Sequence, residues 1–273
     1  MLNYYYSPIP DTTLFSDDFF AKESQLIGFD LNEAKQLELL KKFVGKYRTE
    51  YDRFPVKPAN YYDFFTIQTS YRCVDAQMLY CFVRELKPKK IIEIGSGYST
   101  MLTAQALRKN KTENAECICD FAAIEPYPNV NIKKGFEGLS RLISLPVEKV
   151  PYVEFEELNE NDILFIDSSH TVRAGGDVVY EVLELLPRLK KGVYIHIHDI
   201  FFPFQYPKVF FDDKRFWAEQ YLVQAFLINN DAFEISWTSH YMHRKHTDLL
   251  KSSMNYYEPG MLFVSSLWLK KIK

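Results

Sequence analysis

Histidine and aspartate side chains follow two apolar runs of the sequence, and their types suit proton transfer or metal binding. Asp167-Ser168-Ser169-His170 follows Ile163–Ile166, and His198-Asp199 follows Val193–Ile197. An imidazole with a pKa near neutral can take a proton from a substrate hydroxyl group. Alternatively, the two histidines and two aspartates offer the nitrogen and oxygen ligands of a metal site. The Asp and Ser residues also suit a helix N-cap, which is compatible with ligand binding.

A glycine-containing turn and a glutamate follow two further apolar runs. Gly95-Ser96-Gly97 comes after Ile91–Ile94, where glycines let the backbone turn sharply and approach a ligand closely. A dinucleotide fingerprint needs a third glycine where Thr100 stands, which disfavours a nicotinamide cofactor. Glu125 ends Phe121–Ile124, a position at which an acid can accept both hydroxyls of a ribose. The plainer alternatives are an ordinary tight turn at 95–97 and a solvated carboxylate at Glu125.

For other histidine and aromatic residues, we mainly expect structural roles. His196 lies inside its strand, so we interpret it as a core histidine. His240, His243 and His246 recur every three residues, which on a helix predicts a solvated basic face rather than a metal site. The aromatic run 201–207 indicates either core packing or a lid over the site.

The elements that must position these residues are short apolar runs alternating with helical stretches. This alternation predicts βαβ units and a parallel sheet, whose ligands bind beyond the carboxyl ends of the strands. Wholly apolar strands such as Ile163–Ile166 are typical of a sheet covered on both faces. The other expected strands are Ile91–Ile94, Phe121–Ile124, Leu142–Val147, Val193–Ile197, Phe233–Trp237 and Met261–Leu267, and the expected helices are Val74–Leu86, Ser99–Lys109, Asp177–Leu186 and Lys214–Asn229.

The N-terminal third has a different pattern. Residues 1–29 show no period and predict an irregular arm, after which Asp30 and Glu33 resemble a capping box for a helix that ends before Pro55. We therefore expect an arm and helix over 1–70 that pack on a core domain over 71–273. The arm and the segment 238–260 are expected to shape an acceptor pocket.

Composition limits the class of protein. The 273 residues carry 33 Lys+Arg and 36 Asp+Glu, a net charge of −3, so nucleic acid is not expected as a partner. The four cysteines contain no CxxC pair, which indicates reduced thiols. The N-terminus lacks the order of a signal peptide and no apolar run spans a bilayer, so we expect a cytoplasmic protein with no membrane span. Aromatic residues reach 16%, which favours aromatic-lined clefts.

Taken together, four segments resemble motifs of class I S-adenosylmethionine-dependent methyltransferases, in a bacterial branch that carries D-S-S-H and H-D. They are Ile-Glu-Ile-Gly-Ser-Gly-Tyr-Ser-Thr at 92–100, Ala-Ile-Glu-Pro-Tyr-Pro at 123–128, Asp-Ile-Leu-Phe-Ile-Asp-Ser-Ser-His at 162–170 and Gly-Val-Tyr-Ile-His-Ile-His-Asp-Ile-Phe at 192–201. The branch commonly has Gly-Ser-Asp where this chain has Gly175-Gly176-Asp177. The resemblance implies an α/β, Rossmann-like class I methyltransferase fold with a seven-stranded, mostly parallel sheet and an antiparallel last strand.

The resemblance also implies roles for individual residues. Asp167 would lie between cofactor and substrate, and together with His198 and His170 forms the expected catalytic set. Asp167 and Asp199, with His198 adjacent, match positions at which related branches hold a divalent metal such as Mg²⁺. The residues expected to bind S-adenosyl-L-methionine are Glu93, Gly95, Ser96, Gly97, Ser99, Glu125, Asp167 and Ser168.

The resulting hypothesis is an S-adenosylmethionine-dependent methyltransferase that acts on a hydroxyl of a small molecule or glycan, with or without a metal. A homo-oligomer is left open. One alternative is a metal-dependent hydroxylase on the same fold, and another is a non-catalytic cofactor-binding scaffold.

Overall fold

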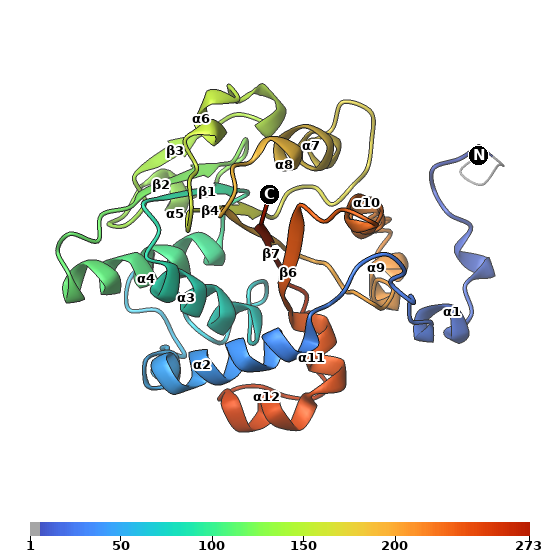
Figure 1. Ribbon diagram of the computed structural model, residues 1–273, viewed down its shortest axis with the longest axis horizontal. Helices are drawn as coiled ribbons and strands as arrows, with labels where there is room; N and C mark the ends of the chain where they lie inside the picture. Colours follow the sequence, from blue (N-terminus) through green and yellow to red (C-terminus); the bar gives the residue numbers. More distant parts are fainter. Residues whose placement is uncertain (1–5) are drawn as a thin grey trace.

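The computed structural model describes residues 6–273 and contains one seven-stranded sheet with helices on both faces (Figure 1). The strand order is β3-β2-β1-β4-β5-β7-β6, and β7 runs antiparallel to both of its neighbours. The predicted α/β fold is therefore confirmed. The strands are β1 (Lys90–Ile94), β2 (Asp120–Ile124), β3 (Arg141–Ile143), β4 (Ile163–Ile166), β5 (Tyr194–Ile197), β6 (Phe233–Thr238) and β7 (Leu267–Lys271).

The register of the parallel strands aligns their carboxyl ends. Ile94 of β1 is level with Ile124 of β2 and with Ile166 of β4. Ile166 is in turn level with Ile197 of β5. Because these four strands end side by side, the polar residues that follow them meet at one edge of the sheet, as the sequence predicts.

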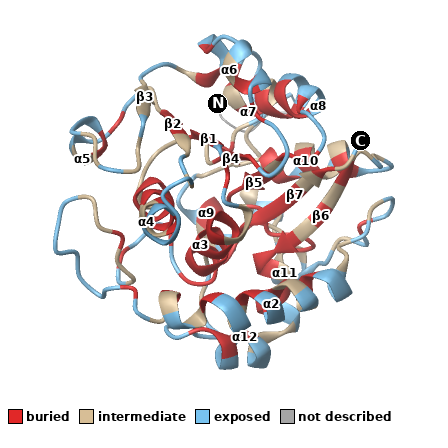
Figure 2. Ribbon diagram, turned by 60° about the vertical axis from the view of Figure 1, so that its left-hand side comes forward, coloured by how far each residue is buried: buried red, intermediate tan, exposed pale blue. Residues whose placement is uncertain are grey.

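Two apolar clusters cover the two faces of the sheet. Figure 2 shows α3 buried along most of its length, whereas α2 and α12 expose their outer sides. The first face carries α2 (Glu33–Tyr51), α3 (Asp75–Leu86), α4 (Tyr98–Glu113), α5 (Val130–Lys133), α11 (Ser239–Lys245) and α12 (Thr247–Ser253). The second carries η2 (Val147–Lys149), α6 (Val153–Glu156), α7 (Asp177–Tyr180), the π-helix η3 (Glu181–Leu185), α8 (Leu186–Arg188) and α10 (Glu219–Leu227).

The N-terminal arm packs on a third, aromatic cluster. After the short 3-10 helix η1 (Thr12–Leu14), its helix α1 (Asp17–Ala21) lies beside α9 (Lys208–Asp212). Phe15 and Phe20 contact the ring of Phe211 edge to face, with ring centroids 5.2 and 5.5 Å apart. The first five residues of the predicted arm lie outside the described residues.

Four predicted elements differ from the structure. The third strand ends at Ile143 rather than Val147, because Pro146 has no N–H to donate to a neighbouring strand and Val147 begins η2. The last strand begins at Leu267 rather than Met261, because the backbone N–H groups of Ser265 and Ser266 donate to the Asp75 carboxylate instead of a neighbouring strand. The helix predicted over 214–229 begins only at Glu219. The predicted capping box of α2 does not form, because Asp30 accepts from the N–H of Asn32, which lies outside the helix with φ at 55°. No helix among residues 6–273 has the length and apolar character that crossing a bilayer requires.

Candidate active site

Two cavities meet at Asp167, beyond the carboxyl ends of the parallel strands. The larger has a volume of about 640 Å³ and the smaller about 410 Å³, both in the range of small-molecule sites. The larger is lined by Ser96, Gly97, Ser99 and Asp167 together with residues of the segment 58–71 and of 129–131. The smaller is lined by Gly95, Glu125, Asp167 and Ser168, with Ile124, Pro146, Val147 and Asp177 among its other residues.

Neither residues 6–29 of the arm nor the segment 238–260 line these two cavities, so the expectation that both shape the acceptor pocket is wrong for the described residues. Instead, arm residues such as Gly28 and Phe29 line a separate cavity beside β6. Tyr256 lines another, on the outer side of α3. The segment 58–71 lines the larger cavity but was not predicted to, because no periodic pattern in its sequence marks it.

The turn after β1 depends on Gly95. Its φ is +94°, a conformation that a side chain disfavours, and a Cβ atom there would collide with the backbone oxygen of Asp167. Gly97 is different, because its φ of 177° suits any residue and a Cβ atom there would meet nothing within 4 Å. Gly95 therefore lets β1 and β4 approach each other, whereas Gly97 leaves open space beside the turn.

Glu93 lies beneath this turn and is 1% exposed. One carboxylate oxygen accepts from the hydroxyl of Ser99, and the other has no hydrogen-bond partner among residues 6–273. Burial raises the pKa of Glu93 to about 8. The buried hydroxyl oxygen of Ser96 likewise has no partner in the described part of the chain.

Glu125 stands at the wall of the smaller cavity. One oxygen of its carboxylate accepts from the N–H of Tyr127 at 2.8 Å. Beside it, Ile124 and Val147 supply buried apolar surface. The cavity thus joins an acidic group to an apolar wall.

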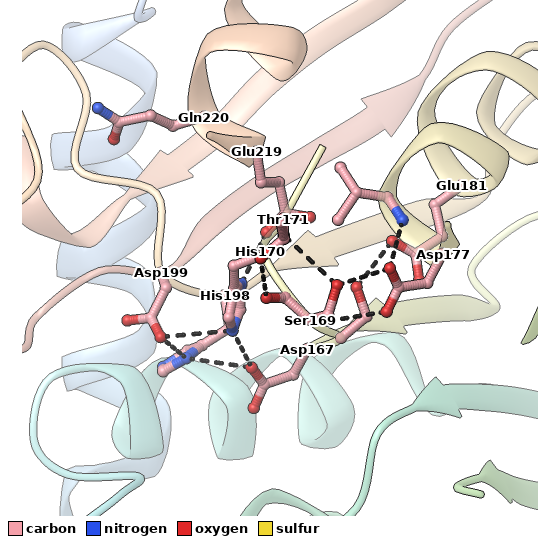
Figure 3. A network of polar contacts seen from close by, with 12 residues as sticks. Asp167, Ser169, His170, Thr171, Asp177, Glu181, His198, Asp199, Glu219 and Gln220 are labelled. Carbon is pink, nitrogen blue, oxygen red and sulfur yellow. Dashed lines mark hydrogen bonds and ion pairs between the residues drawn. The ribbon is translucent and has the colours of Figure 1, made fainter. Parts of the chain in front are cut away.

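A cluster of imidazoles and carboxylates lies next to Asp167 (Figure 3). His170 Nε2 is 3.2 Å from Asp167 Oδ1 and 3.6 Å from Asp199 Oδ2. His198 Nδ1 is 3.7 and 3.6 Å from the same two oxygens. One atom each from Asp167, His170 and Asp199 fall within 4.8 Å of one another, a spacing that a metal ion can bridge.

The charges of this cluster stabilise one another. Burial lowers the pKa of His170 and of His198, but the neighbouring carboxylates outweigh it and hold both pKa values well above their usual range. Burial raises the pKa of Asp167 and Asp199, but the two imidazoles outweigh it and lower both. A base role for either histidine therefore requires its ring to lose its second proton first.

Acidic residues from later helices hold the 167–170 loop. Ser168 donates to Glu181 of η3 at 2.9 Å, and Ser169 donates to Asp177 at 2.6 Å. His170 Nδ1 lies 2.7 Å from Glu219 Oε2. The N-cap interpretation of this loop is wrong, because α7 begins only at Asp177 and its N-cap is Gly176.

Two buried residues that the sequence analysis missed also touch the cluster. Asp75 at the start of α3 is 0% exposed, and its Oδ2 lies 3.5 Å from His198 Nε2. Tyr71 lines the larger cavity and packs its ring 5.0 Å from that of His198. Its buried hydroxyl has no hydrogen-bond partner within residues 6–273. Neither residue lies at a strand exit, where the sequence points to function.

The remaining histidines and the aromatic run have structural roles. His196 is 0% exposed and stacks on Phe165, with ring centroids 4.0 Å apart, so it lies in the core as predicted. It is not a satisfied core histidine, because neither ring nitrogen has a hydrogen-bond partner among residues 6–273. The predicted solvated face of α11 is wrong, because His240 and His243 are buried and pair with Val264 O and the hydroxyl of Tyr257. In the run 201–207, Phe201, Phe202, Phe204 and Tyr206 are buried, which favours core packing.

Comparisons with known proteins agree with this geometry. A family described as "Methyltransferase domain" matches residues 92–200, which contain the Gly95 turn, Glu125 and the imidazole and carboxylate cluster. An uncharacterized protein from Archaeoglobus fulgidus is 30% identical over an alignment of 169 residues, with 59% of this chain and 74% of that protein covered.

Two solved structures are more distant. The O-methyltransferase from Bacillus cereus in complex with SAH is 13% identical, covering 88% of this chain and 91% of that one, with a TM-score of 0.45. The CmcI-N160 apo-structure is 14% identical, covering 74% and 72%, with a TM-score of 0.40. The sheet order, the matched domain and the position of the four motifs at adjacent strand ends together identify the chain as a member of the class I S-adenosylmethionine-dependent methyltransferase family.

Proposed function

We propose that the protein transfers a methyl group from S-adenosylmethionine to an oxygen of a small-molecule or glycan acceptor. The observation that carries the proposal is the meeting of two cavities at Asp167, one beside Glu125 and one beneath the segment 58–71. In a transfer between two bound molecules, two adjoining cavities let donor and acceptor lie in contact, and such orientation supplies much of the rate.

The residues of the smaller cavity fit a nucleoside. Glu125 has one carboxylate oxygen that accepts from Tyr127 and a second that remains for ribose hydroxyls. Ile124 and Val147 offer apolar surface to a base. The open space beside Gly97 suits the methionine part, with Ser96 and Ser99 next to it. Within this proposal, Glu93 supports the turn by accepting a hydrogen bond from Ser99. Ser168 lines the cofactor cavity next to Asp167.

The larger cavity fits an acceptor that combines a ring or polyol with polar groups. Tyr61, Phe65 and Tyr98 supply aromatic surface, and Asn131 supplies an amide. The buried hydroxyl of Tyr71 supplies a further hydrogen-bond donor. This mixture is typical of surfaces that bind sugars and phenols rather than purely apolar molecules.

Deprotonation of the acceptor hydroxyl is assigned to the cluster around Asp167. The cofactor supplies an electrophilic methyl group on its sulfonium, so the protein must orient the acceptor and remove a proton. His198 and His170 are the candidate bases, with Asp167 positioned between the two cavities. The donor atoms of Asp167, His170 and Asp199 also fit a divalent metal, which would lower the pKa of a hydroxyl that it binds, and His198 Nδ1 lies 3.6 Å from Asp199 Oδ2 beside them.

A methyl-transfer screen tests the proposal. Purified protein is incubated with S-adenosylmethionine and panels of sugars, phenols and peptides, and acceptors are read by a mass gain of one methyl group. We expect an oxygen acceptor from the first two panels, and we expect His198→Ala to lower kcat more than it raises KM. Methylation confined to peptide nitrogen would contradict the proposal, and full turnover by His198→Ala would place the base elsewhere.

A metal-dependent hydroxylase is the second candidate, favoured by the imidazole of His170 and the carboxylates of Asp167 and Asp199, a nitrogen and oxygen donor set that suits iron. The two candidates differ in iron content and oxygen dependence. Stoichiometric iron together with oxygen consumption in the purified protein would favour the hydroxylase. A methyl transfer that is insensitive to oxygen would favour the methyltransferase.

A further inference from the structure

His170 is held in place from several sides by residues around the start of α10. Its backbone oxygen accepts from the N–H groups of Ala218 and Glu219 at 3.0 and 3.2 Å. The indole of Trp217 packs on its imidazole, with ring centroids 4.2 Å apart. His170 also adopts a φ of 56°, an uncommon conformation for a residue with a side chain. These contacts offset the cost of that conformation and fix where the ring points.

Glu219 makes a second contact with the same residue. Its Oε2 lies 2.7 Å from His170 Nδ1, while its own N–H donates to the His170 backbone oxygen (Figure 3). The Glu219 side chain is 1% exposed, and a buried carboxylate is costly unless it has a partner. Glu219 Oε1 has no hydrogen-bond partner among the described residues, so the imidazole is the one contact that compensates its burial there.

This pairing decides which ring nitrogen of His170 faces the site. A carboxylate accepts a hydrogen bond, so Glu219 keeps a proton on Nδ1. The ring then presents Nε2 to Asp167 Oδ1 at 3.2 Å and to Asp199 Oδ2 at 3.6 Å. A ligating histidine that donates its other N–H to a carboxylate is a common arrangement at metal sites, because the partner orients the ring and raises its basicity.

We propose that Glu219 is a positioning residue that makes His170 Nε2 a metal ligand beside Asp167 and Asp199. The proposal rests on the metal-assisted form of the function proposed above. An imidazole ligand favours a first-row transition-metal dication over Mg²⁺, which prefers oxygen. Glu219 comes from α10, 49 residues along the chain from His170, and no sequence pattern marks it.

The test uses Co²⁺ as the probe and the full chain, first dialysed against a chelator. We expect Glu219→Gln to weaken Co²⁺ binding by about 10-fold or more, as loss of a carboxylate partner does at other sites. Glu181→Gln is the matched control, because Glu181 is equally buried but its carboxylate accepts from Ser168 and not from a histidine. We expect the control to bind Co²⁺ within twofold of the wild type.

A spectroscopic readout on the wild type keeps the test decisive if Glu219→Gln fails to fold. Co²⁺ shifts the NMR signal of an exchangeable N–H proton on a coordinated imidazole, and burial against Glu219 slows its exchange with water. We expect such a signal in the wild type and its loss in His170→Gln. The proposal is overturned by a wild type that binds no Co²⁺, by a signal that survives His170→Gln, or by equal losses in both glutamate variants.

Binding of S-adenosylmethionine is measured on the same samples. We expect both glutamate variants to bind it as the wild type does, because neither side chain lines the two cavities at Asp167 and the amide oxygen introduced by Glu181→Gln can still accept from Ser168. A wild type that binds S-adenosylmethionine but no Co²⁺ would refute the role of Glu219 and leave the proposed methyl transfer standing. A wild type that binds Co²⁺ but not S-adenosylmethionine would instead refute the proposed methyl transfer.

Discussion

Asp167 is the residue through which both cavities and both imidazoles are connected. Its side chain lines each cavity, and its Oδ1 lies within 3.7 Å of His170 Nε2 and His198 Nδ1. The sequence predicts this position because Asp167 follows a wholly apolar strand. It does not predict the partners Asp75 and Glu219, since they lie on helices far along the chain and contact the cluster only after folding.

Glu93 provides a test of electrostatics at the residue scale. Its pKa is raised to about 8, so between about pH 5 and 8 the folded protein keeps a proton that the unfolded chain releases. The unfolded state then binds fewer protons, and the free energy of unfolding falls as pH rises, by at most about 1.4 kcal/mol per pH unit. We expect Glu93→Gln to remove this dependence.

The measurement is urea unfolding of the wild type and Glu93→Gln at pH 5.5, 7.0 and 8.5. The matched control is Glu85→Gln, because lysine and tyrosine neighbours hold the pKa of Glu85 at about 2 despite partial burial, far below this window. The difference in free energy of unfolding between Glu85→Gln and the wild type should stay constant over these pH values. If the difference in free energy of unfolding between Glu93→Gln and the wild type is also constant, the raised pKa of Glu93 is contradicted.

At the scale of elements, the two glycines in the turn between β1 and α4 have different surroundings, so their substitutions should have different effects. Gly95→Ala introduces a Cβ atom that meets the backbone of Asp167 in a left-handed conformation. We expect it to lower the free energy of unfolding by more than about 1–2 kcal/mol. Denaturant unfolding measures this loss. If Gly95→Ala is as stable as the wild type, the close approach of the turn to Asp167 is not needed for stability.

Gly97→Ala is the companion substitution in the same turn. Its Cβ atom meets nothing within 4 Å, so we expect a change in stability within about 0.5 kcal/mol. The new methyl group would occupy the space proposed for the methionine part of the cofactor. We therefore expect calorimetry to show weaker binding of S-adenosylmethionine to Gly97→Ala. An unchanged affinity would contradict the proposed position of the cofactor beside this turn.

The sequence predicts the parallel strands well and the C-terminal strands less well. Ile163–Ile166 appears with the same bounds, because a strand buried on both faces is an unbroken apolar run. The antiparallel β7 begins later than predicted, because the N–H groups of Ser265 and Ser266 donate to the carboxylate of Asp75, about 190 residues away along the chain. Helix α10 starts late because its first N–H groups bind the backbone of His170. In both cases a distant partner overrides the local pattern.

At the scale of the whole molecule, the N-terminal arm is attached on the side of α9 and α10. Ser24 donates its N–H to Pro203 O and accepts from Gln224, and Phe15 and Phe20 pack on Phe211. We expect removal of residues 1–22 to lower Tm by a few degrees, since each aromatic pair contributes about 0.5–1.5 kcal/mol.

The same truncation should leave the affinity for S-adenosylmethionine within twofold of the full chain, because none of residues 6–22 lines either cavity at Asp167. Thermal melting and calorimetry check the two expectations separately. A truncated protein that stays folded but loses the cofactor would show that the arm contributes to the site.

Calorimetric titration of the full chain with S-adenosylmethionine tests the central claim most directly. The account predicts saturable binding at one site per chain, weakened by about 10-fold or more in Glu125→Ala, because a hydrogen bond to a charged group contributes about 1.5–3 kcal/mol. No binding at millimolar concentrations, or binding that Glu125→Ala leaves unchanged, would contradict it.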